Sequence, residues 1–173
     1  MKKLPKQFFF PLKSFIIMME MKIMKIFIGA DHRGYAMAQQ IYEELKKENY
    51  EIFYSKVATT ENDDYPDFAF DVSKYVMESP ENLGILLCGN GIGISIAANK
   101  VKGIRCARVI NEDDAYKARN HNGANVIAFG GLSLEEAMKI VHKFIMTPAA
   151  NEERHLKRIQ KIINYENGEY NEL

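Results

Sequence analysis

The sequence predicts an α/β fold of the Rossmann-like type, a three-layer sandwich in which a five-stranded parallel sheet has helices on both faces. Three observations favour it. From residue 25 onward, short apolar runs alternate with longer segments of helical periodicity, the pattern of repeated strand–helix units. Runs such as "GILLC" at 84–88 are apolar throughout, as expected for strands that are buried on both faces. A chain of 173 residues is long enough for one domain with a proper core.

The first half of the chain is predicted to hold two strands, each followed by a helix. The strands are "KIFIGA" at 25–30 and "YEIFYS" at 50–55, with a helix over 35–49 between them. A polar loop over 56–66 ends in Pro66, which suits the first turn of the next helix. Apolar side chains recur at helical spacing in the two helices: Tyr35, Ala38, Ile41, Tyr42 and Leu45, then Phe68, Val72, Tyr75 and Val76.

The second half continues the same alternation. Strands are predicted at 83–88, 103–109 and 125–130, separated by helices at about 92–101 and 113–120.

Two more helices close the chain. Ser133 is expected to cap a helix that runs to about Met146, with Glu136 completing a capping box. A final helix is predicted over about 149–165, with one apolar side formed by Leu156, Ile159, Ile162 and Ile163.

These elements place one domain at 24–165, between an N-terminal tail at 1–23 and a C-terminal tail at 166–173. The N-terminal tail has a basic start and a Phe/Ile/Met-rich patch, so a signal peptide has to be weighed. Pro11 and Lys13 interrupt the apolar run, and no small-residue cleavage site follows. The run is also too short to span a bilayer. We interpret it as a tail, such as one added by an upstream start codon, because further methionines precede the first strand.

Composition excludes several classes of partner. The 23 basic and 23 acidic residues balance, and no basic face indicates nucleic acid. No segment predicts a membrane span. The two cysteines, Cys88 and Cys106, form neither a CxxC motif nor a disulfide framework. This usage is typical of a reducing compartment, so we expect a cytoplasmic protein.

Ligands of parallel α/β sheets bind outside the carboxyl ends of the strands, near a switch in strand order. The first and third strands end here in "GADHRG" and "CGNGIG". Cys88 lies directly before a helix, where free N–H groups and the helix dipole favour a thiolate. The alternative is a buried core cysteine, which fits Cys106 better. The loop glycines, Gly89, Gly91 and Gly93, would let backbone amides bind an oxyanion or phosphate, or would simply form a tight turn.

Other candidates have equally plain alternatives. Asp31 and His32 could orient hydroxyl groups and exchange protons, or could be a cap and an exposed imidazole. His121, before the fifth strand, could be a general acid or base, or a solvated loop residue. Arg154 and Arg158 are one helical turn apart, so they could bind a phosphate together, or pair with nearby glutamates on a solvated face.

Taken together, these motifs resemble the type B ribose-5-phosphate isomerases, a group that includes galactose-6-phosphate isomerase subunits. The resemblance covers about residues 24–160. The motifs occur in the family's order: "GADHRGY", "DDYPDFA", "CGNGIGISIAANK", "GIRCA", "ARNHNGANVIAFGG" and "NEERHLKRI". It implies a homodimer, or a tetramer, with sites shared between subunits, a sugar-phosphate substrate, and no metal or cofactor.

The resemblance also implies residue roles. Cys88 matches the base that moves a proton between C1 and C2 of the open-chain sugar, and Asp31 matches the residue that holds the ring oxygen or its hydroxyl. His121, with Asn122, matches residues that reach over from the partner subunit, where the histidine helps to open the furanose ring. The remaining matches bind substrate: Tyr65 at the sugar, the amides of Gly89, Gly91 and Gly93 at the enediolate, and His32, Arg154 and Arg158 at the phosphate.

Two positions depart from the family pattern. Asn90 stands where the family usually has Thr; its amide can donate a hydrogen bond but cannot relay a proton as a hydroxyl does. Leu132 stands where many members have Arg, which removes one expected phosphate contact. His121 favours ribose 5-phosphate as substrate. The alternatives are a hexose-6-phosphate isomerase, for allose or galactose 6-phosphate, and a catalytically weak sugar-phosphate-binding protein.

Overall fold

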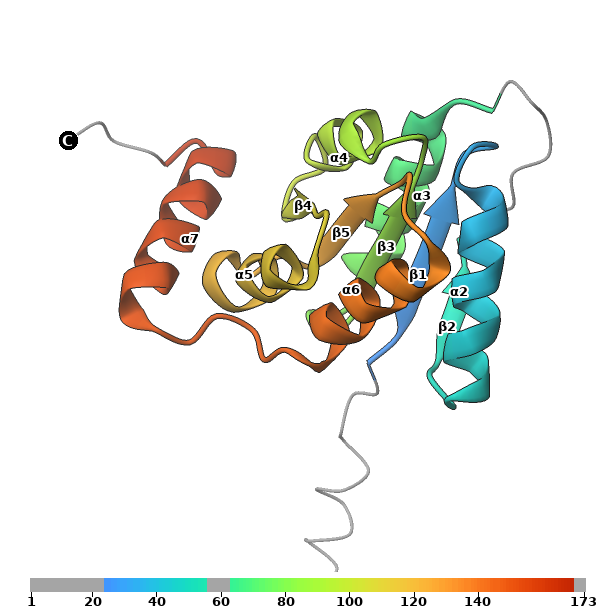
Figure 1. The fold of residues 1–173 in the computed structure, drawn as a ribbon. Coiled ribbons are helices and arrows are strands. Elements are labelled where there is room, and N and C mark those ends of the chain that lie inside the picture. The colour runs from blue at the N-terminus through green and yellow to red at the C-terminus, as the bar shows by residue number, and fades with distance from the viewer. Residues whose placement is uncertain (1–23, 56–62, 170–173) are drawn as a thin grey trace, which may run out of the picture.

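The computed structural model describes residues 24–55 and 63–169. Its centre is a five-stranded sheet of order β2-β1-β3-β5-β4, in which every neighbouring pair is parallel (Figure 1). The strands are β1 (Ile26–Ala30), β2 (Ile52–Tyr54), β3 (Leu83–Leu87), β4 (Cys106–Arg108) and β5 (Val126–Phe129). The predicted fold class is confirmed.

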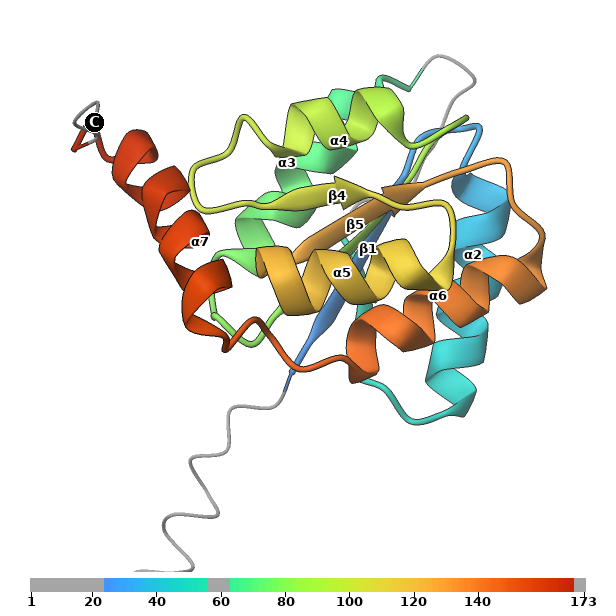
Figure 2. The ribbon, with the colours of Figure 1, turned by 60° about the vertical axis from the view of Figure 1, so that its left-hand side comes forward.

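Helices cover both faces of the sheet. On one face lie α2 (Tyr35–Lys47), α5 (Glu112–Asn122) and α6 (Leu134–Met146); on the other lie α3 (Tyr65–Val76) and α4 (Ile92–Ala98). The last helix, α7 (Glu153–Glu166), packs beside α5, off the β4 side of the sheet (Figure 2).

The two faces explain why β3 is apolar throughout. Ile85 points into the core formed with α2, α5 and α6, whereas Leu86 points into the core formed with α3 and α4. Both side chains are fully buried, and burying a side chain of this size contributes about 1.5–3 kcal/mol. A polar residue at either position would therefore face a core, which is why the strand does not alternate.

The ends of several elements differ from the prediction. β4 begins at Cys106 rather than at 103, because Gly103 adopts φ +85° and the Arg105 amide bonds to the side chain of Asn125. α5 extends through Asn122 and ends at Gly123 with φ +58°. α7 begins at Glu153 rather than at 149.

Other expectations agree or lie outside the described residues. The Ser133–Glu136 capping box is present. The N-terminal tail, most of the 56–66 loop and the last four residues of the C-terminal tail lie outside the described ranges. Within those ranges, no helix combines the length and the apolar character needed to cross a membrane.

The sheet order places the first and third strands side by side. Ala30 of β1 pairs with Leu87 of β3, and the amide of Asp31 donates to the Leu87 carbonyl at 3.2 Å. The two predicted loops, which contain Asp31 and Cys88, therefore leave the sheet together at its carboxyl edge.

Candidate active site

A cavity of about 440 Å³ opens at the carboxyl edge of β1 and β3. Three segments form its wall: the loop after β1, the loop after β3, and the residues that lead into α3. Its lining residues are Asp31, His32, Arg33, Asp63, Asp64, Tyr65, Cys88, Gly89, Asn90 and Gly93.

The three glycines of the loop after β3 differ in how little space the structure leaves for a side chain. Gly91 has φ +76°, and a Cβ there would lie 2.6 Å from the Phe129 Cα. A Cβ at Gly93 would lie 2.7 Å from the ring of Tyr65. A Cβ at Gly89 would meet only the flexible Arg33 side chain, at 3.2 Å. The chain's own side chains and backbone therefore require two of these glycines, while the third leaves the cavity open.

Cys88 belongs to both the core and the cavity. Its side chain packs in the core cluster beneath α3 and α4, and the residue is only 6% exposed. The residue nevertheless lines the cavity, and its sulfur accepts a hydrogen bond from the Gly91 amide at 3.2 Å. An N–H group that points at sulfur stabilises a thiolate. Cys106, which was expected to be the buried core cysteine, is only partly buried. Burial still raises the pKa of its thiol to about 12, and it lies in β4, outside this cavity.

Hydrogen bonds to its side-chain and carbonyl oxygens hold Asn90 in place. Its side-chain Oδ1 accepts from the Ile92 amide at 3.0 Å, and its carbonyl oxygen accepts from Arg108 Nε at 2.8 Å. The side-chain NH₂ group is then left to donate toward the cavity that the residue lines.

Asp31 caps a turn, as one interpretation expected, and also lines the cavity. Its Oδ1 accepts from the amides of Arg33 (2.9 Å) and Gly34 (3.0 Å), so it caps the turn before α2. The residue is also buried and lines the cavity, and its second oxygen is available to a ligand. His32 is exposed at the cavity rim.

Sequence reasoning missed part of the wall. Arg33 stands inside the quoted "GADHRGY" motif, and Asp63 and Asp64 stand inside "DDYPDFA". Their place beside recognised residues was the available signal. Arg33 adds a positively charged residue to this wall. Tyr65, the first residue of α3, was expected here and is 40% exposed.

Four expected residues do not line this cavity within a single chain. His121 and Asn122 end α5, where Asn122 Nδ2 donates to the Lys117 carbonyl. Arg154 and Arg158 lie on an exposed side of α7. Arg154 pairs with Glu152 at 2.8 Å, as in the solvated-face alternative. The convergence of thiol and paired arginines does not occur within one chain.

His121 belongs to a cluster of stacked rings away from the cavity. It lies in the last turn of α5, not in a loop as expected, and its ring stacks on His155 at a centroid distance of 4.4 Å with an interplanar angle of 9°. Tyr116 contacts His121 edge-on. Burial, and then the positive charge that His121 and Arg154 can carry, hold the pKa of His155 below its ordinary value. The stack therefore favours a neutral His155.

This stack predicts a pH dependence of stability. Because the pKa of His155 is lower in the folded state, the unfolded state binds more protons in acid. We expect the unfolding free energy to fall as the pH drops below the ordinary histidine value of about 6.5, and to fall less steeply in His155→Gln. Urea unfolding of both proteins between pH 7.5 and 5 measures this. Equal slopes would show that His155 titrates as freely in the folded as in the unfolded chain.

No group of three or more His, Cys, Asp or Glu side chains is placed to hold a metal ion within 24–55 and 63–169. The groups at the carboxyl edge of the sheet that could take part in a reaction are a thiol, backbone amides and an aspartate. The family model described as Ribose/Galactose Isomerase matches residues 26–162.

The chain belongs to this family. Ribose-5-phosphate isomerase B of Mycobacterium tuberculosis is 40% identical over 146 residues, which cover 83% of this chain and 90% of that protein. A probable ribose-5-phosphate isomerase B of Mycoplasma genitalium is 44% identical over 147 residues, covering 82% and 95%.

Solved structures of the ribose/galactose isomerase family share the fold. Ribose-5-phosphate isomerase B of Clostridium thermocellum has a TM-score of 0.79 at 40% identity, over 83% of this chain and 98% of that one. The enzyme of Mycoplasma genitalium with bound ribulose-5-phosphate has a TM-score of 0.79 at 41% identity, over 83% and 97%. The resemblance drawn from the motifs is therefore confirmed, and it extends over the whole cavity described above.

Proposed function

We propose that the protein is an aldose–ketose isomerase that interconverts D-ribose 5-phosphate and D-ribulose 5-phosphate through an enediolate. One observation carries the proposal: the Cys88 sulfur accepts a hydrogen bond from the Gly91 amide of a glycine-rich loop, and both segments adjoin a cavity of about 440 Å³ at the switch point of the sheet. Relatives at about 40% identity are named ribose-5-phosphate isomerase B, and one similar structure holds ribulose-5-phosphate.

The proposed chemistry needs one base and donors for a developing oxyanion. The Cys88 thiolate removes the proton from C2 of the open-chain aldose, and the electron pair moves into the C1 carbonyl to form the enediolate. The same thiol then returns the proton to C1, while the O2 hydroxyl becomes the ketone and its proton passes to O1. Backbone amides of 89–93 and the Asn90 side chain would donate to the oxyanion, which is where such donors act most strongly.

The other cavity residues fit the substrate. Asp31 offers its second carboxylate oxygen to a sugar hydroxyl or to the ring oxygen. Tyr65 forms an aromatic wall beside Gly93. His32 at the rim would contact the phosphate. The phosphate is remote from C1 and C2, so its contacts contribute to the affinity for the substrate equally in the ground and transition states.

We further propose that the active unit is a homodimer in which each site takes residues from both copies. His121 and Asn122 of a second copy would open the furanose ring, and its Arg154 and Arg158 would bind the phosphate. The support is that these side chains lie at the surface, away from their own chain's cavity. Beside that cavity, α4 exposes Ile92 (46%) and Ile96 (57%), which a second copy would cover. The two cysteines of the chain, Cys88 and Cys106, are not disulfide-bonded, which fits a cytoplasmic enzyme.

A second substrate class stays open because the family description names galactose as well as ribose. A hexose 6-phosphate has one more carbon between the reacting end and the phosphate. Purified protein should therefore be assayed under identical conditions with ribose 5-phosphate, allose 6-phosphate and galactose 6-phosphate. We expect the highest kcat/KM with ribose 5-phosphate; a higher value with a hexose phosphate would reassign the substrate.

The isomerisation itself is tested by hydrogen exchange. Ribose 5-phosphate is incubated with the protein in heavy water, and NMR follows C2 of the aldose and C1 of the ketose. We expect deuterium at both positions, since the thiol exchanges its proton with solvent. A protein that binds ribose 5-phosphate without any exchange at C2 would be a sugar-phosphate-binding protein and not an isomerase.

Arg158→Ala is expected to raise the KM for ribose 5-phosphate by about 10–100-fold, because a hydrogen bond to a charged group contributes about 1.5–3 kcal/mol. The kcat should change little, since the phosphate is bound equally in the ground and transition states. Lys157→Ala removes a neighbouring exposed cation of α7 and is the matched control. Equal KM values in the two variants would remove Arg158 from the phosphate site.

A further inference from the structure

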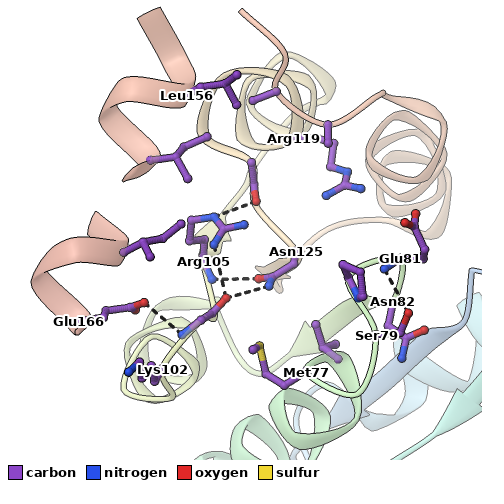
Figure 3. A pocket seen from close by; sticks show the side chains of 18 of the residues that line it. Met77, Ser79, Glu81, Asn82, Lys102, Arg105, Arg119, Asn125, Leu156 and Glu166 are labelled. Carbon is purple, nitrogen blue, oxygen red and sulfur yellow. Dashed lines mark hydrogen bonds between the residues drawn. The ribbon is translucent and has the colours of Figure 1, made fainter. Parts of the chain in front are cut away.

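A second and larger cavity, of about 760 Å³, lies between α7 and the amino edge of the sheet (Figure 3). One wall is the apolar side of α7, with Leu156, Ile159 and Ile163. The opposite wall is built by the loops that lead into β3, β4 and β5. It is on the other edge of the sheet from Cys88, and the two cavities share no lining residue.

Two guanidinium groups reach this cavity. Arg105 Nε donates to the Gly123 carbonyl at 2.9 Å, and Arg119 Nη1 donates to the Ala124 carbonyl at 3.1 Å. Arg119 Nε is buried and has no hydrogen-bond partner. Figure 3 shows the Arg119 guanidinium projecting into the open space beside Glu81. Among the described residues, neither arginine is ion-paired with a carboxylate.

Nearby carboxylates compensate these positive charges only in part. Burial lowers the pKa of both groups, and the positive charge of Arg105 lowers the pKa of Arg119 further. Glu81 acts on Arg119, and Glu166 on Arg105, in the opposite sense, but Glu166 already accepts a hydrogen bond from the Gly103 amide. Half-buried cations are costly unless an anion pairs with them.

We propose that this cavity is a second binding site, for a small organic molecule with one carboxylate or phosphate group on an apolar body. The anionic group would bridge Arg119 and Arg105, whose planar forks suit both oxyanions. The apolar body would pack against Leu156 and Ile159 of α7 and against Met77 on the facing wall. Glu81 and Glu166 line the same cavity, so polyanions are disfavoured.

The probes separate the parts of this claim. Phenyl phosphate and benzoate both have an apolar ring and one anionic group, which is a phosphate in the first and a carboxylate in the second. Inorganic phosphate lacks the apolar body, phenol lacks the charge, and tripolyphosphate carries too many charges. The methyl signals of Leu156 and Ile159 report on this cavity by NMR, and those of Ile92, at the start of α4, report on the Cys88 side. The site does not depend on the proposed isomerase activity.

We expect benzoate or phenyl phosphate to shift the Leu156 and Ile159 methyl signals with saturation, and phenol and tripolyphosphate to leave them in place. Arg119→Gln should weaken the binding at least 10-fold, whereas Arg158→Ala should not change it. Leu156→Ser, at an exposed position, keeps the test open if Arg119→Gln fails to fold, and should also weaken binding. Equal affinity for phenol, or shifts that follow protein concentration instead of ligand, would overturn the proposal.

Discussion

Cys88→Ala is expected to lower the kcat for ribose 5-phosphate by about 10²–10⁴-fold, the range by which a positioned base accelerates a proton transfer. The sulfur accepts a hydrogen bond from the Gly91 amide at 3.2 Å, and Cys88 lines the cavity. No other cysteine is among the residues that line it. Substrate affinity should survive, because the proposed phosphate and hydroxyl contacts remain. The measurement is steady-state isomerisation, together with ribose 5-phosphate binding by calorimetry.

Cys106→Ala is the matched control for this loss. Its thiol lies in β4, partly buried beside the core, and is assigned no part in the reaction, so kcat should stay within about 2-fold of wild type. Both substitutions remove one sulfur atom and should each cost about 1 kcal/mol of stability, typical of a small core truncation. An isomerase with normal turnover in the Cys88 variant would exclude this thiol as the base.

Gly130→Ala should destabilise the protein by about 3 kcal/mol or more, because overpacking against backbone cannot be relieved by a rotamer change. A Cβ at Gly130 would lie 2.0 Å from the Cys88 carbonyl oxygen, 2.9 Å from the Gly89 carbonyl carbon and 3.0 Å from the Asn90 nitrogen. The end of β5 thus packs directly on the loop that holds the thiol. Loss of stability and loss of the oxyanion donors should therefore occur together.

Gly89→Ala separates this packing effect from the general cost of replacing glycine. A Cβ there meets only the Arg33 side chain, which can move aside, so we expect a change within about 1 kcal/mol. Urea unfolding of the two variants and the wild type gives the comparison. Similar unfolding free energies for Gly130→Ala and Gly89→Ala would mean that the loop is not clamped by β5.

Local rules predicted most of the fold. The uniformly apolar run of β3 required two covered faces, and the Ser133–Glu136 pair capped α6 as expected. The start of β4 is set by a distant partner, since the side chain of Asn125 keeps Arg105 out of the strand. The end of α5 is set locally, since the helix continues until Gly123 can take a positive φ. The spacing of apolar residues specifies neither.

The candidate active site was also predictable only in part. Asp31 and Cys88 end neighbouring parallel strands, so the topology alone brings them together. The wall that includes Arg33 and Asp64 depends on how three loops fold against one another, which residue pattern does not specify. His121 and the arginines of α7 belong to surfaces that only a second chain could bring to the cavity, and sequence reached them only through the family resemblance.

The most direct test of a thiol base in a site shared between two copies is complementation. Cys88→Ala and His121→Ala are each expected to be almost inactive as purified proteins. Unfolded and refolded together in equal amounts, they should recover about a quarter of wild-type activity, because half of the random dimers are mixed and each mixed dimer has one intact site of two. A mixture that stays as inactive as its parts would show that Cys88 and His121 of different copies do not form one site.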